Sequence, residues 1–174
     1  MENFINKKTA CLREGTEVLL NQQIAMEARA TASYLSMASW CAIHGYKHAS
    51  AYCYAQSDEE REHMLRIFHY LSDAGGRALQ SDIINIQQDF SSLQEIFELA
   101  LAQEIKVSHA IHGIAQHCLE QGDMASFNFI QWFIKEQVEE EATVRQILDL
   151  FHVIGQTDVG LYLIDKEIGA LKGK

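Results

Sequence analysis

Proline is absent from this chain of 174 residues, and the chain also lacks an excess of basic residues and a long apolar run. Because proline interrupts helices and concentrates in turns, its absence predicts an almost entirely helical domain. The 14 basic and 24 acidic residues give a net charge of −10, which argues against nucleic-acid binding because no basic face is available for phosphates. No apolar run approaches the roughly 20 residues of a membrane span, so no membrane association is expected.

Cysteine pairs with metal or redox spacing are also missing. The four cysteines (Cys11, Cys41, Cys53 and Cys118) are far apart and form no C-x-x-C motif, so they are interpreted as reduced thiols. Residues 1–15 contain no apolar stretch typical of a secretion signal, and a cytoplasmic protein is therefore expected. The length fits a single domain over residues 1–174, with a sizeable core.

Five helical segments are predicted between the glycines and polar clusters that punctuate the chain. The first and second segments are joined by about three residues, as are the third and fourth, and short loops of this kind connect antiparallel helices. The connection between the second and third is about 16 residues and reaches ~50 Å when extended, enough to pass a helix of ~42 Å. The prediction is an all-α four-helix bundle with one long crossover and a short fifth helix, the segments being approximately 16–43, 47–74, 92–121, 124–154 and 158–171.

Each of the four long segments has an apolar stripe that is interrupted near its middle by a glutamate. Antiparallel packing brings the middle levels of the helices together, so these glutamates are expected to converge in the core. Burying a carboxylate costs several kcal/mol unless it is neutralised, and a whole domain is stable by only about 5–15 kcal/mol. No lysine or arginine lies on the stripes at this level, so a bound cation is the simplest compensation for Glu27, Glu60, Glu104 and Glu140.

A histidine strengthens the metal interpretation. His63 follows Glu60 by three residues and shares its helix face, which is the Glu-x-x-His arrangement of a metal ligand pair. An oxygen-rich set with one imidazole favours iron or manganese over structural zinc. Two divalent ions fit if Glu60 bridges them, with Glu27 and His63 on one ion and Glu104 and Glu140 on the other. We call these five residues the paired site. A lone glutamate on such a stripe is usually a surface residue, so a metal-free helical scaffold remains an alternative.

Two further residues lie on the same stripes. Gln137 is one turn before Glu140, where it can support the second ion or its water. Tyr34 is two turns after Glu27, where it either packs in the core or serves the site by hydrogen bonding to a ligand or donating an electron. Both interpretations of Tyr34 stay open on the sequence alone.

A second acidic group borders the paired site. Its members are turned away from the stripes toward one side of the bundle, where a run of charges is ordinarily a solvated face. A third and looser metal position is an equally good interpretation of Glu59, Glu136 and Glu139.

Taken together, these motifs resemble the bacterial non-haem ferritins. The resemblance rests on Glu27 with Tyr34, on Glu59-Glu60-Arg-Glu-His63, on Glu104, and on the segment FNFIQWFIKEQVEEE, which contains Glu136-Gln137-x-Glu139-Glu140. It implies a ferritin-like four-helix bundle in which the paired site is a di-iron ferroxidase centre. It also implies that Glu59, Glu136, Glu139 and Glu140 form a third iron site. Members of that family assemble as homo-oligomeric shells of 24 subunits that oxidise Fe(II) with O₂ or H₂O₂ and store ferric mineral.

Departures from neighbouring families narrow the resemblance. A second Glu-x-x-His is missing because Val107 follows Glu104 by three residues. Arg61 stands where bacterioferritins carry their haem-ligating methionine, so haem is not expected. The competing function is a di-metal (Fe/Mn) redox enzyme of low oligomeric state that acts on peroxide or a small substrate.

Two details bear on assembly. The fifth helix is too short to complete the bundle, so its apolar residues Leu161, Ile164, Ile168 and Leu171 are expected to pack against symmetry mates. Glu120 and Asp123 lie at the turn between the third and fourth helices. The resemblance places this turn at three-fold pores, which makes both residues candidates for the path of iron into a shell.

Overall fold

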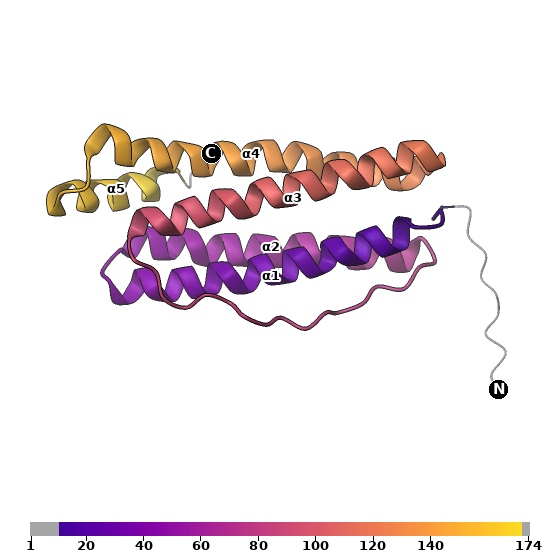
Figure 1. The fold of residues 1–174 in the computed structure, drawn as a ribbon, viewed down its shortest axis with the longest axis horizontal. Helices are drawn as coiled ribbons and strands as arrows, with labels where there is room; N and C mark the ends of the chain where they lie inside the picture. The colour runs from indigo at the N-terminus through magenta and orange to yellow at the C-terminus, as the bar shows by residue number, and fades with distance from the viewer. Residues whose placement is uncertain (1–10, 172–174) are drawn as a thin grey trace.

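Five helices make up the regular structure of residues 11–171, the part of the chain that the computed structural model describes (Figure 1). They are α1 (Thr16–Ile43), α2 (Lys47–Asp73), α3 (Leu93–Gln121), α4 (Met124–Ile154) and α5 (Asp158–Leu171), and each boundary lies within one residue of the predicted one. No strand occurs in this part of the chain, so the predicted all-α bundle is confirmed. The predicted domain also includes residues 1–10 and 172–174, which lie outside the described residues.

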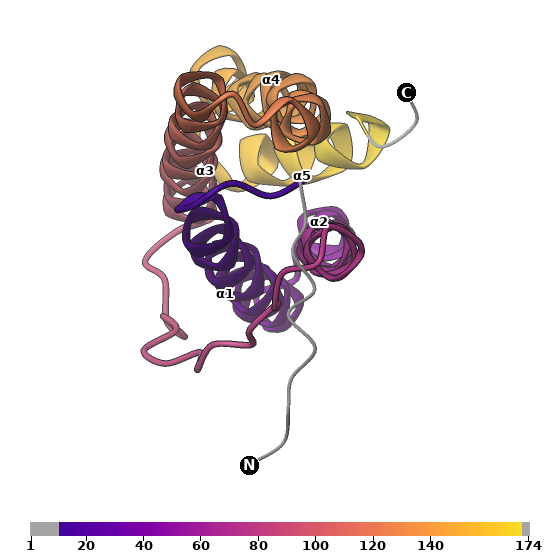
Figure 2. The ribbon, with the colours of Figure 1, turned by 90° about the vertical axis from the view of Figure 1, so that its right-hand side faces the viewer.

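The four long helices form two hairpins that stack side by side, as the end-on view shows (Figure 2). A turn of residues 44–46 joins α1 to α2, and Gly122 and Asp123 join α3 to α4. Asp123 caps α4 by accepting a hydrogen bond from Ser126 N at 3.0 Å, and Ser92 caps α3 by accepting one from Glu95 N at 3.1 Å. Side-chain caps of this kind satisfy the unpaired amides of a first helical turn.

The long crossover between α2 and α3 runs along α1 for most of the length of the bundle (Figure 1). Because it has no regular structure, its backbone groups need partners from elsewhere, and α1 supplies them at two-turn intervals. Asn21 pairs with Arg77 O and Leu79 N at 2.9 and 2.7 Å, Arg29 donates to Ile84 O and Asn85 O at 2.8 and 3.1 Å, and Ser36 donates to Gln87 O. The crossover is thereby held against α1.

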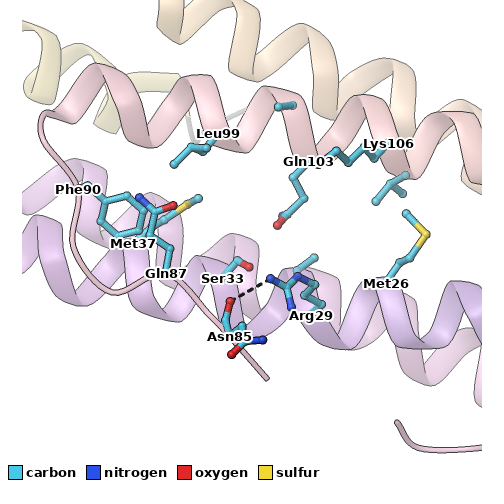
Figure 3. Close-up of a pocket in the computed structure, with 13 residues that line it drawn as sticks. Met26, Arg29, Ser33, Met37, Asn85, Gln87, Phe90, Leu99, Gln103 and Lys106 are labelled. Carbon is cyan, nitrogen blue, oxygen red and sulfur yellow. Dashed lines mark hydrogen bonds between the residues drawn. The ribbon is translucent and has the colours of Figure 1, made fainter. Parts of the chain in front are cut away.

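A pocket of about 300 Å³ lies between α1, α3 and the crossover (Figure 3). Its lining includes the apolar Met26, Met37 and Phe90 together with the cationic side chains of Arg29 and Lys106. None of its lining residues is a predicted metal ligand. Since two cations border it, this pocket does not suit a metal ion.

The hydrophobic core is divided into two clusters. One is built around Phe97, Ile147 and Phe151 near one end of the bundle, and the other around Ile24, Ile111 and Phe133 near the opposite end. The four mid-helix glutamates are buried between them without belonging to either cluster. No helix of residues 11–171 combines the length and apolar character needed to cross a membrane.

Helix α5 belongs to the subunit's own core. Ile164 and Ile168 are completely buried in the Phe97 cluster, and Leu161 and Leu171 pack against it. The prediction that Ile164 and Ile168 pack on symmetry mates is therefore wrong, whereas for the half-buried Leu161 and Leu171 such a contact stays a prediction. Ile164 and Ile168 are buried within the subunit because α5 folds back between α2 and α4 (Figures 1 and 2) and buries its apolar stripe there.

A carboxylate of α5 also caps another helix. The first turn of α2 has no side-chain cap of its own, and Asp165 replaces it by accepting hydrogen bonds from His48 N at 3.1 Å and Ala49 N at 2.8 Å. This pairing joins the last helix to the start of the second.

We expect Asp165→Ala to lower the stability of the protein by about 1 kcal/mol, the usual cost of losing a helix cap. The loss should appear as a lower melting temperature in calorimetry. Asp165→Asn should retain part of the effect because its amide oxygen still accepts one bond. Lys166→Ala, at the exposed neighbouring position, is the control. An Asp165→Ala protein that melts with the Lys166→Ala control would contradict the capping role.

Candidate metal centre

The four predicted glutamates are all buried in the core, each on a different long helix, but Glu104 does not join either of the two groups of converging ligand atoms described below. Glu27, Glu60, Glu104 and Glu140 are 0%, 3%, 1% and 8% exposed. Carboxylates so deeply buried are found in proteins when they are paired or coordinate a metal. The part of the chain that the structure describes brings no lysine or arginine into an ion pair with any of them.

Glu27, Glu60 and His63 form the tightest group. One ligand atom from each lies within 4.8 Å of the other two, and His63 Nδ1 is 3.3 Å from Glu60 Oε2. Gln23 Nε2 donates to Glu27 Oε1 at 2.8 Å, whereas no ordinary hydrogen-bond donor of residues 11–171 reaches the buried Glu27 Oε2. A carboxylate oxygen left in this state is costly, and a cation among the three side chains removes the cost. The residues therefore fit a divalent ion.

Glu104 is oriented by two neighbours. Tyr34 donates its hydroxyl to Glu104 Oε1 at 2.7 Å, and Gln137 Nε2 donates to Glu104 Oε2 at 3.2 Å. Of the open interpretations of Tyr34, the structure shows the hydrogen bond to a predicted ligand. Gln137 acts on the site through Glu104, so both residues hold one carboxylate in place.

Burial shifts the acid–base behaviour of the whole cluster. Desolvation, followed by the charge of Glu60, raises the pKa of Glu27 well above its usual range. Desolvation, followed by the charge of Glu104, does the same to the pKa of Glu60. Desolvation raises the pKa of Glu140 to about 9, with further contributions from Glu59, Glu104 and Glu136. Glu140 thus retains its proton at neutral pH, and a cation that binds the cluster must displace protons that are held more tightly than on ordinary carboxylates.

The second acidic group lies beside the paired site, on α2 and α4. Ligand atoms of Glu59, His63, Glu136 and Glu140 all lie within 4.8 Å of one another. We call Glu59, Glu136 and Glu140 the outer set; Glu140 also belongs to the paired site. Glu59 is held by Gln56, whose Nε2 donates to its carboxylate at 2.6 Å.

Glu139 stands apart from the outer set. Its side chain is 66% exposed, with Lys135 Nζ at 4.0 Å, and it does not join the group of converging ligand atoms. It does line a vestibule of about 210 Å³ that opens onto the outer set, together with Tyr52, Glu59, Glu136 and Glu140. Glu139 therefore lies at the rim of the predicted third position.

Three residues near the site were missed by sequence reasoning. Gln23 and Gln56 each lie four residues before a glutamate of the paired site. The sequence could have indicated them, because a buried polar residue beside an apolar stripe needs a hydrogen-bond partner. Tyr52 is 5% exposed, and its hydroxyl is buried without a partner. A tyrosine in a helix is ordinarily a packing residue, so the sequence carried no signal for it.

The two residues predicted to guide iron differ in exposure. Asp123 is 2% exposed, and its carboxylate accepts from Ser126 N and from Arg13 N, each at 3.0 Å. It therefore caps α4 and ties down the chain before α1, a structural role that does not need an open path. Glu120 is exposed and accepts a hydrogen bond from Gln116 at 2.9 Å.

The raised pKa of Glu140 predicts how the stability of the metal-free protein depends on pH. Above about pH 4.5 the unfolded chain has released this proton, whereas the folded chain retains it up to about pH 9. Stability therefore falls as pH rises between these values, by up to about 1.4 kcal/mol per pH unit for one retained proton. Melting temperatures from pH 5 to 9 should show the decline, and Glu140→Gln should reduce it. A wild-type melting temperature that is constant over this range would contradict the burial of ionisable carboxylates.

The architecture and the site together define a class of protein: a four-helix bundle with one long crossover and inward-facing carboxylates. A family model described as a ferritin-like domain matches residues 17–153, and the chain belongs to this ferritin family. The resemblance to bacterial non-haem ferritins is thereby confirmed.

Individual relatives agree with the family match. A Haemophilus influenzae protein described as a probable bacterial non-heme ferritin-like protein is 34% identical over 94% of this chain and 99% of its own length. A bacterial non-heme ferritin of Campylobacter jejuni is 37% identical over 86% of this chain and 90% of its own. Among solved structures, an open pore ferritin from Archaeoglobus fulgidus superposes with a TM-score of 0.87 and 32% identity, covering 91% of this chain and 98% of that one.

Proposed function

We propose that this chain is an iron-storage ferritin subunit that oxidises Fe(II) to Fe(III) at the paired site. The observation that carries the proposal is the meeting of the buried Glu27, Glu60 and His63, whose ligand atoms lie within 4.8 Å of one another. Glu104 and Glu140 are buried on the two other long helices. Family membership supports the same function. Fe(II) and O₂ or H₂O₂ are the proposed substrates, and the cytoplasm is the proposed location.

The charges of the paired site match two ferrous ions. Four carboxylates carry four negative charges when ionised, which two divalent cations neutralise, so burial of the loaded site is tolerable. In this proposal Glu27 and His63 hold the first ion, Glu104 and Glu140 hold the second, and Glu60 bridges both. Oxidation adds two positive charges, which the neighbouring Glu59 and Glu136 offset.

Tyr34 is proposed to act in the oxidation as an electron donor. A phenol that loses an electron must also release its proton, and the Glu104 carboxylate lies 2.7 Å from the hydroxyl to receive it. Burial and the charge of Glu104 raise the pKa of Tyr34 well above its usual range, so the proton stays on the phenol until an electron leaves. The electron would then pass to the O₂ or H₂O₂ that is reduced at the paired site, while the proton passes to Glu104.

The storage function requires a shell, for which we propose 24 copies of this chain. Size-exclusion chromatography with light scattering should give a particle of about 470 kDa, which is 24 times the chain mass of 19.7 kDa. A dimer or monomer would contradict storage and would favour a di-metal redox enzyme of low oligomeric state.

We expect His63→Ala and Glu60→Ala to abolish rapid Fe(II) oxidation while the particle still assembles. His63 supplies the imidazole of the paired site and Glu60 its bridge, so each loss should slow oxidation by more than about a hundredfold. Stopped-flow absorbance after mixing with Fe(II) and oxygen measures the rate. Glu62→Ala, at an exposed position between the two, is the control. Wild-type rates in the Glu60→Ala protein would refute this assignment.

The outer set is proposed to hold a third iron ion. Glu59→Gln and Glu136→Gln should change the amount of oxidant consumed per iron without stopping the first oxidation, because neither carboxylate holds an ion of the paired site. Glu139→Gln should change it less, since its side chain is at the rim. Oxygen-electrode measurements with counted iron give the ratio. If Glu136→Gln alone stops the initial reaction, the division into two sites is wrong.

A further inference from the structure

The hydroxyl of Tyr52 is a buried polar group on a side chain that borders the outer set. The side chain is 5% exposed and its oxygen is inaccessible to solvent, yet no hydrogen-bond partner within residues 11–171 reaches it. The ring is held in place by Phe97, with the ring centroids 5.8 Å apart. Tyr52 also forms part of the lining of the vestibule together with Glu59, Glu136 and Glu140.

Packing alone does not account for this hydroxyl. A phenylalanine would keep the contact with Phe97 without burying an unpaired polar group, which is destabilising. The other tyrosine at the site differs, because Tyr34 donates to Glu104 at 2.7 Å. We therefore infer that the hydrogen-bond acceptor of the Tyr52 hydroxyl arrives with a bound ligand.

The surroundings identify the chemistry of that ligand. The charged side chains that line the vestibule are Glu59, Glu136, Glu139 and Glu140, so its occupant is a cation. Burial raises the pKa of Tyr52 well above its usual range, and the charge of Glu140, ahead of those of Glu104 and Glu59, adds to this rise. A hydrated divalent cation held by the outer set would bring ordered carboxylate and water oxygens to this place, each able to accept a hydrogen bond.

We propose that Tyr52 is a positioning residue for the outer set, where its hydroxyl donates a hydrogen bond to an oxygen atom in the coordination shell of a bound divalent cation. The inference rests on the proposed function, because the cation is the one assigned there to the outer set. Tyr52 acts through that oxygen and is not itself a ligand. It stabilises the cation at the outer set and leaves the ions of the paired site unaffected.

The test compares Tyr52→Phe with the wild-type assembled protein by calorimetric titration with Zn²⁺, which is redox-inert. The wild type should show a tight class of sites and a weaker class that Glu136→Gln removes. Tyr52→Phe should weaken the second class about tenfold, the effect of losing a hydrogen bond to a charged group, and should leave the tight class unchanged. Tyr54→Phe, two residues along at a 48% exposed position, is the matched control and should bind as the wild type does.

The melting temperature of the metal-free protein separates positioning from packing. Tyr52→Phe should melt at or above the wild-type temperature, because it removes a buried hydroxyl that has no partner. Unchanged Zn²⁺ affinities in Tyr52→Phe, or a weakening accompanied by a lower melting temperature, would overturn the role of Tyr52 while leaving the proposed function intact. A wild type without any class of sites that depends on Glu136 would overturn the cation at the outer set, and with it both proposals for this region.

Discussion

Four glutamates lose their hydration when the bundle closes, and in the ionised state they also repel one another. Both effects oppose folding, and the two apolar clusters on either side of the carboxylate layer must outweigh them. The protein lessens the cost in two ways that the structure makes visible. Raised pKa values keep protons on the carboxylates, and neutral donors such as Gln23 and Tyr34 satisfy some of the oxygens. The Glu27 oxygen that receives no ordinary hydrogen-bond donor from residues 11–171 marks where compensation is incomplete, which is where we propose that a cation binds.

The rest of the fold holds this layer at a fixed height. Short turns set the register within each hairpin, and the crossover is fastened to α1 by Asn21, Arg29 and Ser36. Asp165 ties α5 to the first turn of α2, the helix that carries Glu60 and His63. A site built on the middles of four packed helices is more rigid than one built on loops, which suits the proposed metal centre.

The helices and the buried glutamates could be predicted from the sequence because the patterns that indicate them lie within single helices. Helix ends are marked by capping residues such as Ser92, and a glutamate in an apolar stripe is a strong violation of helix patterning. What the sequence could not supply is the distance between side chains on different helices. It therefore grouped Glu139 with Glu59 and Glu136, although one helical step turns Glu139 toward Lys135. The missed role of Asp165 and the wrong packing of Ile164 have the same cause, since both depend on how α5 folds back against α2 and α4.

The central claim is that the four mid-helix glutamates and His63 hold two iron ions. Crystals of the protein soaked anaerobically in Fe(II) and measured on both sides of the iron absorption edge test it directly. We predict two anomalous peaks at the paired site of each subunit, one bordered by Glu27, Glu60 and His63 and the other by Glu60, Glu104 and Glu140. A further peak at the outer set would be the third ion proposed there. Peaks confined to the protein surface, with none within the bundle, would contradict the claim.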